Sequence, residues 1–369
     1  MHDLIVIGGG PAGTAAAITA AHDGADVLLL ERGHYPRHKV CGEFVSAESL
    51  ELLANLLTPD KSTLLRNAVR IPQARIFLDN RCLETAVNPP AASIARLELD
   101  SALWGSAASA GVETMQKTVV HSIRGAGPFL VTTSAGTFGS RTVIQASGRW
   151  SNLNPTAEEN GEARWLGLKA HFAERRSSLS TDLYFFDDGY CGVQPVRLHV
   201  PDPHQELGLE EVRVNACAMV RASSATTMEE VLTRQPQLQE RSRSWRLLME
   251  PIVTFPLIFR DPCPEENGIL RVGDAAGFVD PFVGDGISLA LRSGRLAAAS
   301  LQPFLAGQAP LTAAIRAYAN AYEQQLVPVF RASSKIRQLL LLPRRLRAPL
   351  LAVLQSAPVI TRYLVSKTR

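Results

Sequence analysis

A glycine-rich turn between apolar segments at the start of the chain constrains the fold more than any other feature. The stretch "LIVIGGGPAGTAAAITAAHDGADVLLLE" begins with four apolar residues, 4–7, which predict a buried parallel strand. An alanine-rich run at 14–22 predicts a helix, and residues 27–30 predict a second buried strand. Strand, turn, helix and strand in this order form a βαβ unit, which predicts an α/β fold built on a parallel sheet.

The turn has the glycine spacing of dinucleotide-binding proteins, G-x-G-x-x-G, as Gly8, Gly10 and Gly13. The first glycine permits the tight turn, the second lets the backbone approach a pyrophosphate, and the third lets the helix pack closely on the strand. The helix beginning near Pro11 offers free N–H groups to the phosphates. Glu31 ends the second strand, where a carboxylate accepts ribose hydroxyls and repels a 2′-phosphate. A glycine turn that binds no ligand is the alternative.

A second glycine-rich segment, "RVGDAAGFVDPFVGDGISLA", follows about 260 residues later. Asp274 stands at the end of a predicted strand, where it could accept a ribityl hydroxyl. Gly284, Asp285 and Gly286 precede a long predicted helix, whose N-terminus could stabilise negative charge on a flavin's pyrimidine ring. The nucleotide domain would then be completed by segments that lie far apart in the chain. A glycine turn with an ordinary helix cap is the alternative.

Arg96 stands near the start of another predicted helix, in the stretch "RLELD". Its guanidinium could reach a cofactor phosphate. It could equally form a surface ion pair with Glu98 or Asp100.

Between residues 165 and 220 the hydrophobic period changes to that of β-strands. Four apolar stretches, "WLGLKAHF", "DLYFFDD", "YCGVQPVRLHV" and "EVRVNACAMV", are separated by turn residues. They predict an antiparallel sheet that forms a second domain, inserted into the first.

Composition and charge exclude several classes of protein. The net charge of +3, without a stripe of basic residues interleaved with aromatics, argues against a nucleic-acid partner. The five cysteines are scattered and form no zinc-site spacing, so we expect reduced thiols in the cytoplasm and no metal. An apolar strand beginning at Leu4 leaves no room for a secretory leader, and no apolar run is long enough to span a membrane.

These segments together resemble the geranylgeranyl reductase family of FAD-dependent oxidoreductases, within the para-hydroxybenzoate hydroxylase-like flavoprotein superfamily. "GGGPAG" with Glu31-Arg32 is similar to the family's adenosine-binding fingerprint, and "YPRHKVCGE" to its Pro-Arg-x-Lys-x-Cys-Gly signature. "RLELD" is similar to its Arg-x-x-Leu-Asp, and "VGDAAGFVDPFVGDGISLALRSG" to its GD motif. The match is close over residues 1–50 and 270–300 and loose between them.

The resemblance implies a Rossmann-like FAD-binding domain with an inserted antiparallel β-sheet substrate domain and a helical C-terminal tail. The expected FAD-binding domain is discontinuous and comprises residues 1–70, 92–160 and 262–330. The expected substrate domain comprises residues 71–91 and 161–261, and the C-terminal helical tail comprises residues 331–369.

The resemblance also implies which residues contact the FAD. The adenosine half would lie along the first glycine turn and the flavin ring under the sheet domain. The expected cofactor-binding residues are Gly8, Gly10, Pro11, Ala12, Gly13, Glu31, Arg32, Lys39, Cys41, Gly42, Arg96, Gly148, Gly273, Asp274, Pro281, Gly284, Gly286 and Ile287.

Three residues are candidate catalytic groups. Cys41 could pack on the flavin as a small hydrophobic residue, donate a proton or act as a redox partner, and we favour packing. The resemblance places His171 and Tyr190 within reach of the cavity, together with Lys169. His171 and Tyr190 are candidate proton donors, although residues of these types are more often ordinary strand residues than catalysts.

Three functions fit these motifs. The first is reduction of carbon–carbon double bonds in an isoprenoid or polyketide-type lipid, with NAD(P)H or a protein as electron donor. The second is monooxygenation of an apolar aromatic or polyketide, and the third is non-catalytic carriage of a prenylated protein on a related fold. The aromatic Tyr-x-Trp-x-Phe-Pro pattern of archaeal reductases is replaced by "GYCGVQPV", which tells against a prenyl-lipid substrate. We expect the reductase, because of the Cys-Gly and GD segments.

The C-terminal tail bears on the substrate and on the location of the protein. Its apolar clusters are separated by Pro343, Pro349 and Pro358, with several arginines between them. Two placements fit this pattern: short helices packed over the FAD-binding domain, or basic amphipathic helices lying on an anionic membrane surface. We therefore expect a cytoplasmic protein acting on an apolar small molecule, with peripheral membrane contact in the second case.

Overall fold

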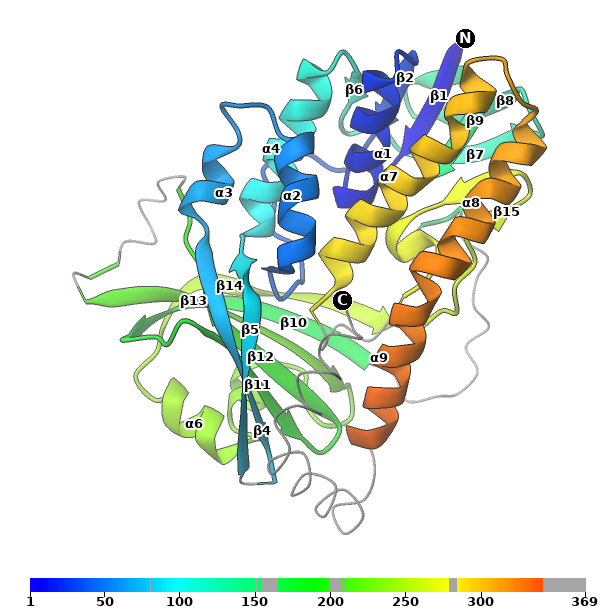
Figure 1. Cartoon of the computed structure of the whole chain (residues 1–369). Coiled ribbons are helices and arrows are strands. Elements are labelled where there is room, and N and C mark those ends of the chain that lie inside the picture. The colour runs from blue at the N-terminus through cyan, green and yellow to red at the C-terminus, as the bar shows by residue number, and fades with distance from the viewer. Residues whose placement is uncertain are drawn as a thin grey trace.

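The structure is a computed structural model that describes residues 1–79, 81–149, 151–153, 165–199, 207–208, 210–278 and 284–340 of the chain. Among these residues the strands form two eight-stranded sheets, drawn one above the other in Figure 1. No helix among them is long and apolar enough to cross a membrane.

The first sheet has a parallel centre, as the glycine turn predicts. Its main path runs β15-β16-β9-β1-β2-β6, and β7 and β8 extend it through β9. The strands of the main path are β1 (His2–Ile7), β2 (Val27–Leu30), β6 (Glu113–Met115), β9 (Gly136–Gln145), β15 (Glu265–Glu266) and β16 (Ile269–Arg271). The two added strands are β7 (Val120–Gly125) and β8 (Phe129–Thr133). Pairing of β1 with both β2 and β9 is parallel, which places the ends of β1 and β9 beside each other.

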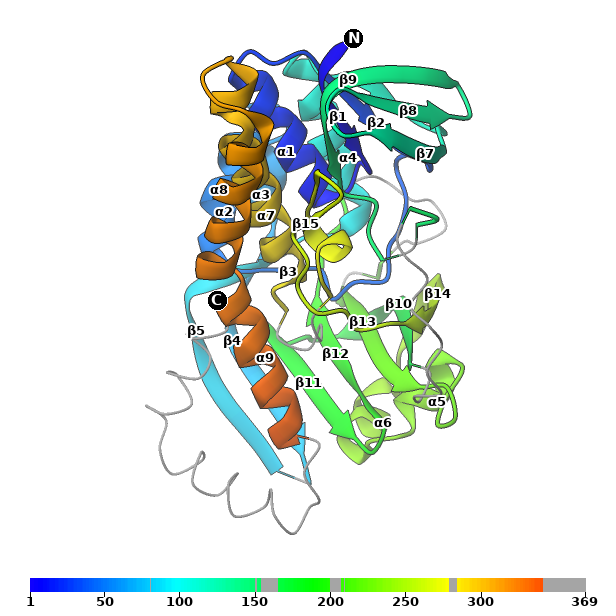
Figure 2. The same ribbon diagram turned by 90° about the vertical axis from the view of Figure 1, so that its right-hand side faces the viewer.

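Helices cover one face of the first sheet, and the β7–β8 strands lie on the other side (Figure 2). The helices around this sheet are α1 (Pro11–His22), α2 (Ala47–Leu56), α3 (Thr63–Asn67), α4 (Arg96–Ser109), α7 (Gly286–Leu305), α8 (Leu311–Gln325) and α9 (Val327–Leu340), with a 3₁₀ turn, η1 (Gly273–Ala275). Helices α1 and α7 pack in direct contact, since a Cβ added at Gly294 would lie 2.0 Å from the carbonyl oxygen of Ala12. The two glycine-rich segments therefore meet at one end of the sheet.

The second sheet has the order β14-β10-β13-β12-β11-β4-β5-β3. Its strands are β3 (Phe44–Val45), β4 (Val69–Leu78), β5 (Arg81–Ser93), β10 (Trp165–Arg175), β11 (Ser180–Phe186), β12 (Gly189–Pro195), β13 (Glu211–Arg221) and β14 (Arg246–Leu257). Two short helices, α5 (Met228–Leu232) and α6 (Pro236–Ser242), follow β13. The predicted second sheet is confirmed, with one correction. The sheet is not wholly antiparallel, since β4 and β11 pair in parallel. The β4–β5 hairpin precedes residues 165–220 in the chain and joins their strands at β11.

The structure confirms the predicted fold class, including a helical C-terminal region that begins with α8 and α9. Residues 341–369, which carry the arginines and prolines of the predicted tail, lie outside the described residues. The predicted domain boundaries stay predictions. β4 and β5 run across the predicted boundaries at 70/71 and 91/92, and β3 lies within residues 1–70 yet pairs with β5 of the second sheet.

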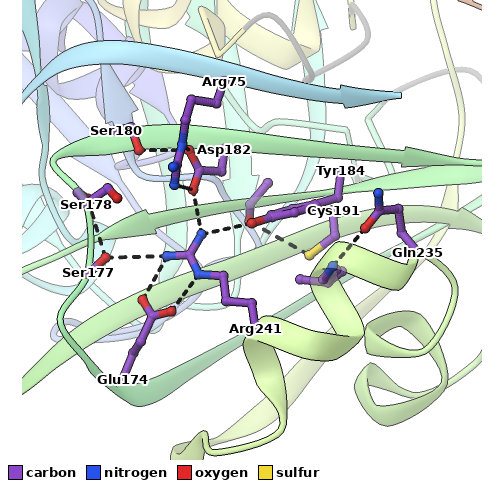
Figure 3. Close-up of polar contacts among 12 residues, drawn as sticks. Arg75, Glu174, Ser177, Ser178, Ser180, Asp182, Tyr184, Cys191, Gln235 and Arg241 are labelled. Atoms are coloured by element: carbon purple, nitrogen blue, oxygen red, sulfur yellow. Dashed lines mark hydrogen bonds and ion pairs between the residues drawn. The ribbon is translucent and has the colours of Figure 1, made fainter. Parts of the chain in front are cut away.

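A network of buried ion pairs holds α6 against the second sheet (Figure 3). Arg241 donates two hydrogen bonds to Glu174 on β10, at 2.5 and 2.7 Å, and one to Asp182 on β11, at 2.5 Å. Asp182 also accepts from Arg75 on β4 at 2.7 Å and from Ser180 at 2.8 Å. The carboxylates of Glu174 and Asp182 are 9% and 1% exposed, so these charges depend on their partners rather than on water.

We expect Arg241→Met to lower the free energy of unfolding by about 3–5 kcal/mol, because it leaves the buried Glu174 carboxylate without its main partner and removes one partner of Asp182. Urea unfolding of the FAD-loaded protein measures the change. The matched control is Arg243→Met, whose ion pair with Glu240 is 69% and 67% exposed and contributes at most about 1 kcal/mol. Equal losses in the two variants would show that the buried network does not stabilise the sheet.

Candidate functional site

A single cavity of about 750 Å³ connects the first glycine turn with the second sheet. Its walls come from β1, the start of α1, the segment after β2, the start of α7, and strands of the second sheet. Most of the residues expected to contact FAD line it: Gly8, Gly10, Pro11, Ala12, Glu31, Arg32, Lys39, Cys41, Gly42, Arg96, Gly148, Gly273, Asp274, Gly284, Gly286 and Ile287. Gly13 does not line the cavity, and Pro281 lies outside the described residues.

The first glycine turn leaves room for a phosphate group at the start of α1. A Cβ atom added at Gly10 would meet no heavy atom within 4 Å, so the backbone there faces open space. Gly13 has a different part: a Cβ there would lie 1.8 Å from the carbonyl oxygen of Gly8, so this glycine allows the helix to pack on the strand. The open N-terminus of α1 at Gly10 fits a pyrophosphate.

Glu31 is held as a charged carboxylate at the end of β2. It accepts the backbone N–H groups of Gly9 at 2.9 Å and Gly33 at 2.7 Å, and it pairs with Arg37 at 2.8 Å. Burial by itself would raise the pKa of Glu31, but Arg37 and these two N–H groups bring that pKa below its ordinary value. A charged acceptor at this place fits the predicted contact with ribose hydroxyls.

The segment after β2 and the start of α7 form the middle of the cavity. Added Cβ atoms at Gly42 and Gly286 would meet no heavy atom within 4 Å, so both backbones face open space. Asp274 lies on η1 and forms an ion pair with Arg149 at 3.3 Å. Burial lowers the pKa of Lys39 to about 8, assisted by the neighbouring arginines. Open backbone, a helix N-terminus and a carboxylate are what the flavin half of FAD requires.

Arg96 lines the cavity and is paired within the protein, so its contact with a cofactor phosphate stays a prediction. Its guanidinium donates two hydrogen bonds to Asp100, each at 2.7 Å, and interacts with the Cys41 thiol. The predicted ion pair is therefore with Asp100 rather than Glu98, and it is buried rather than on the surface. Glu98 instead contacts His199 at 3.0 Å.

The second sheet supplies a largely apolar wall. Tyr190 is part of it, and its ring packs on Phe185 with 5.5 Å between ring centroids. Few polar side chains interrupt this wall. Its apolar lining residues include Ile76, Leu78, Leu83, Val87, Leu183, Met219, Ile252 and Leu257, from β4, β5, β11, β13 and β14. Such a wall fits an apolar substrate.

The structure corrects the expected placement of His171 and Lys169. Neither residue lines the cavity; both side chains are fully buried on β10, where they contact Glu43 behind the cavity wall. Direct proton donation from His171 to a substrate therefore has no geometric support. Of the three candidate catalytic residues, Cys41 and Tyr190 reach the cavity.

Two residues near this wall were not singled out from the sequence. Glu43 follows Cys41-Gly42, and the only available signal was a charged residue directly after the Cys-Gly pair. His38 lines the cavity, and burial lowers its pKa to about 4, assisted by Lys169 and His171. Ligand atoms of His38, Glu43 and His171 lie within 4.8 Å of one another, a spacing that could hold a metal. The Lys169 ammonium on the same carboxylate opposes a second cation there.

Comparisons with known proteins agree with this site. Residues 3–46 match a family model described as FAD dependent oxidoreductase. The chain is 25% identical to a menaquinone reductase of Mycolicibacterium smegmatis, over 97% of this chain and 89% of that protein. It is 26% identical to digeranylgeranylglycerophospholipid reductase 3 of Methanosphaera stadtmanae, over 92% of this chain and 86% of that protein.

Solved structures share the fold over the whole chain. A geranylgeranyl bacteriochlorophyll reductase-like protein from Thermoplasma acidophilum has a TM-score of 0.76 at 20% identity, covering 100% of this chain and 95% of its own. A flavin-dependent brominase has a TM-score of 0.76 at 18% identity, covering 100% of this chain and 93% of its own. The same architecture therefore occurs in proteins described as a reductase-like protein and as a brominase.

Proposed function

We propose that the chain, an FAD-dependent oxidoreductase similar to the geranylgeranyl reductases, reduces carbon–carbon double bonds in an apolar isoprenoid or polyketide-type lipid. The observation that carries the proposal is one continuous cavity, with an open helix N-terminus at Gly10 and an apolar wall on the second sheet. The named reductases support an isoprenoid, since they include a menaquinone reductase and a digeranylgeranylglycerophospholipid reductase.

In this proposal the turn at Gly10, the carboxylate of Glu31 and the starts of α1 and α7 hold the cofactor. When bound, FAD supplies the reducing equivalents for the reaction. The wall of β4, β5 and β11 to β14 excludes water and orients the lipid chain. NAD(P)H or a protein donor would supply the electrons.

Saturation of a double bond adds two hydrogens, and one of them must arrive as a proton. The Cys41 thiol and the Tyr190 hydroxyl belong to residues that line the cavity, so these two groups are the proton donors that the geometry favours. His38 also lines the cavity, but its lowered pKa leaves it neutral near pH 7.

Peripheral membrane contact through the C-terminal tail also stays a proposal.

Monooxygenation of an apolar aromatic or polyketide is the second candidate, because the same apolar wall would serve it. The non-catalytic carrier has less support, since the menaquinone reductase and the digeranylgeranylglycerophospholipid reductase that the chain resembles are named as enzymes.

The two candidates predict different results when the flavin is reduced without oxygen. With the reductase, we expect a geranylgeranyl lipid, which carries no quinone ring, to reoxidise the flavin anaerobically and to gain two hydrogens per reduced double bond, measured by absorbance and mass spectrometry. A fully saturated chain is the control and should leave the flavin reduced. Reoxidation only on admitting oxygen, with an oxygen atom in the product, would instead establish the monooxygenase.

A further inference from the structure

A fully buried group of charged and polar side chains lies at the cavity wall, where Glu43 belongs to the lining and its two partners lie behind it. Glu43, Lys169 and His171, here called the Glu43 cluster, have side chains that are 0% exposed. Lys169 donates to one carboxylate oxygen of Glu43, and His171 Nε2 lies 3.1 Å from the other. The cluster thus joins the segment after β2 to β10 of the second sheet.

The cluster holds the turn that carries Cys41 and Gly42. Glu43 has a φ of 62°, in the left-handed region that costs energy for a residue other than glycine. Its carboxylate accepts the backbone N–H of Arg96 at 2.8 Å, and its carbonyl accepts that of Ile94 at 2.9 Å. Its own N–H lies 3.3 Å from the Cys41 sulfur, so the conformation of Glu43 determines where that thiol lies.

A second contact from the sheet supports the same turn. The side-chain amide of Asn215, on β13, donates to the carbonyl oxygen of Cys41 at 3.1 Å. Asn215 is the cross-strand partner of His171, so the two supports are adjacent on neighbouring strands. The Cys41 turn is therefore attached to the second sheet at two neighbouring points.

The charges of the cluster balance. Burial by itself would raise the pKa of Glu43, but Lys169 and His171 hold that pKa far below its ordinary value, so the carboxylate is charged. Burial lowers the pKa of His171, although Glu43 opposes that change, so burial disfavours a second cation beside Lys169. One carboxylate and one ammonium remain, and removing either would leave the other uncompensated next to the cavity.

Stability alone does not explain an ion pair at this place. A buried ion pair is often no more stabilising than apolar residues of the same volume, because both charges must be desolvated. The cross-strand partners of Lys169 are Cys217 on β13 and Ile252 on β14, so an apolar side chain would suit this position of the sheet. A balanced pair of charges at the wall points to a role in the electrostatics of the cavity.

We propose that Glu43 and Lys169 are positioning residues that fix the Cys41–Gly42 turn and, through their balanced charges, set the redox potential of the flavin. The inference rests on the FAD site of the proposed function. Neither residue supplies a proton or electron to the substrate in this proposal. They act on the reaction through the position of Cys41 and through the electrostatic field in the cavity.

Midpoint potentials of the bound flavin test the charge balance. In Glu43→Gln the uncompensated ammonium should favour the reduced, more negative flavin, so the potential should rise. In Lys169→Met the uncompensated carboxylate should lower it, and the double variant should lie near the wild-type value. Lys61→Met, which removes an exposed lysine beside Asp60, is the matched control and should leave the potential unchanged. Shifts of the same sign, or none, would overturn the electrostatic role.

Alkylation of the FAD-free protein tests the positioning of the turn. We expect Cys41 to react with iodoacetamide about tenfold faster in Glu43→Gln and in Lys169→Met, because loss of the cluster frees the turn. Peptide mass spectrometry assigns each site, and the fully buried Cys191 reports unfolding and should stay unmodified. A Cys41 rate equal to that of Lys61→Met would overturn the positioning role.

The two measurements separate this inference from the proposed function. A dye-coupled reductive titration needs no lipid substrate, so the potentials decide the charge balance even if alkene reduction is never observed. Alkylation needs no flavin, so it decides the positioning role even if FAD binds elsewhere.

Discussion

Gly10→Val is expected to lower the affinity for FAD by about 100-fold, or roughly 3 kcal/mol, while the protein without cofactor stays folded. The backbone at Gly10 has an ordinary φ of −75° and faces open space, so the protein alone tolerates a side chain there. The valine methyl groups would occupy the space that the pyrophosphate needs at the N-terminus of α1. The requirement for glycine at this position therefore comes from the ligand.

Titration with FAD, followed by quenching of flavin fluorescence, measures this loss, and circular dichroism checks the fold. The matched control is Gly105→Val on α4, where an added Cβ would lie at an ordinary 3.5 Å from the Lys61 side chain. This variant should bind FAD as the wild type does. Unchanged FAD affinity in Gly10→Val would place the cofactor away from the first glycine turn.

Gly13→Val is expected to destabilise the fold itself, by more than about 3 kcal/mol, because it inserts atoms where backbone already lies. The first atom of any side chain would be 1.8 Å from the Gly8 carbonyl oxygen and 3.1 Å from the Ala146 side chain. Neither neighbour can withdraw easily, since β1 is paired with β2 and β9 on its two sides. We expect this variant to be insoluble, or to unfold at a much lower urea concentration than the wild type.

The same substitution at two glycines three residues apart is therefore expected to have different effects. Gly10→Val lowers the affinity for FAD, and Gly13→Val lowers the stability of the fold. Urea unfolding of Gly10→Val and Gly13→Val without FAD makes the comparison direct. A Gly13→Val protein as stable as Gly10→Val would contradict the close packing of α1 on β1.

Local patterns predicted the first sheet well, because its signals lie within short stretches of sequence. The apolar runs at 4–7 and 27–30 lie within β1 and β2, and the alanine-rich run lies within α1. The strands of the second sheet were also indicated by their period, but their partners were not. Parallel pairing of β4 with β11 joins residues about 107 positions apart, and no local pattern encodes that contact.

The residues of the candidate site also fall into two groups, those that local patterns predicted and those that only long-range contacts place. Some residues would contact the cofactor through their backbone or through a helix N-terminus. These residues stand in glycine motifs, whose spacing can be recognised from the sequence alone. Glu43, Lys169 and His171 stand in no glycine motif, and their placement depends on contacts between residues 126 and 128 positions apart. The resemblance placed His171 in the cavity, but His171 instead contacts Glu43, although it shares a face of β10 with Gly167, which lines the cavity.

The sequence by itself determined the βαβ unit and the glycine turns, because steric limits on glycine and the period of apolar residues act over a few residues. Its resemblance to a flavoprotein family indicated FAD. Only the tertiary structure decided that Cys41 and Tyr190 face the cavity while His171 and Lys169 lie behind its wall. It also decided that Arg96 pairs with Asp100 inside the protein. These placements depend on burial, and burial is settled when segments far apart in the chain pack together and exclude water.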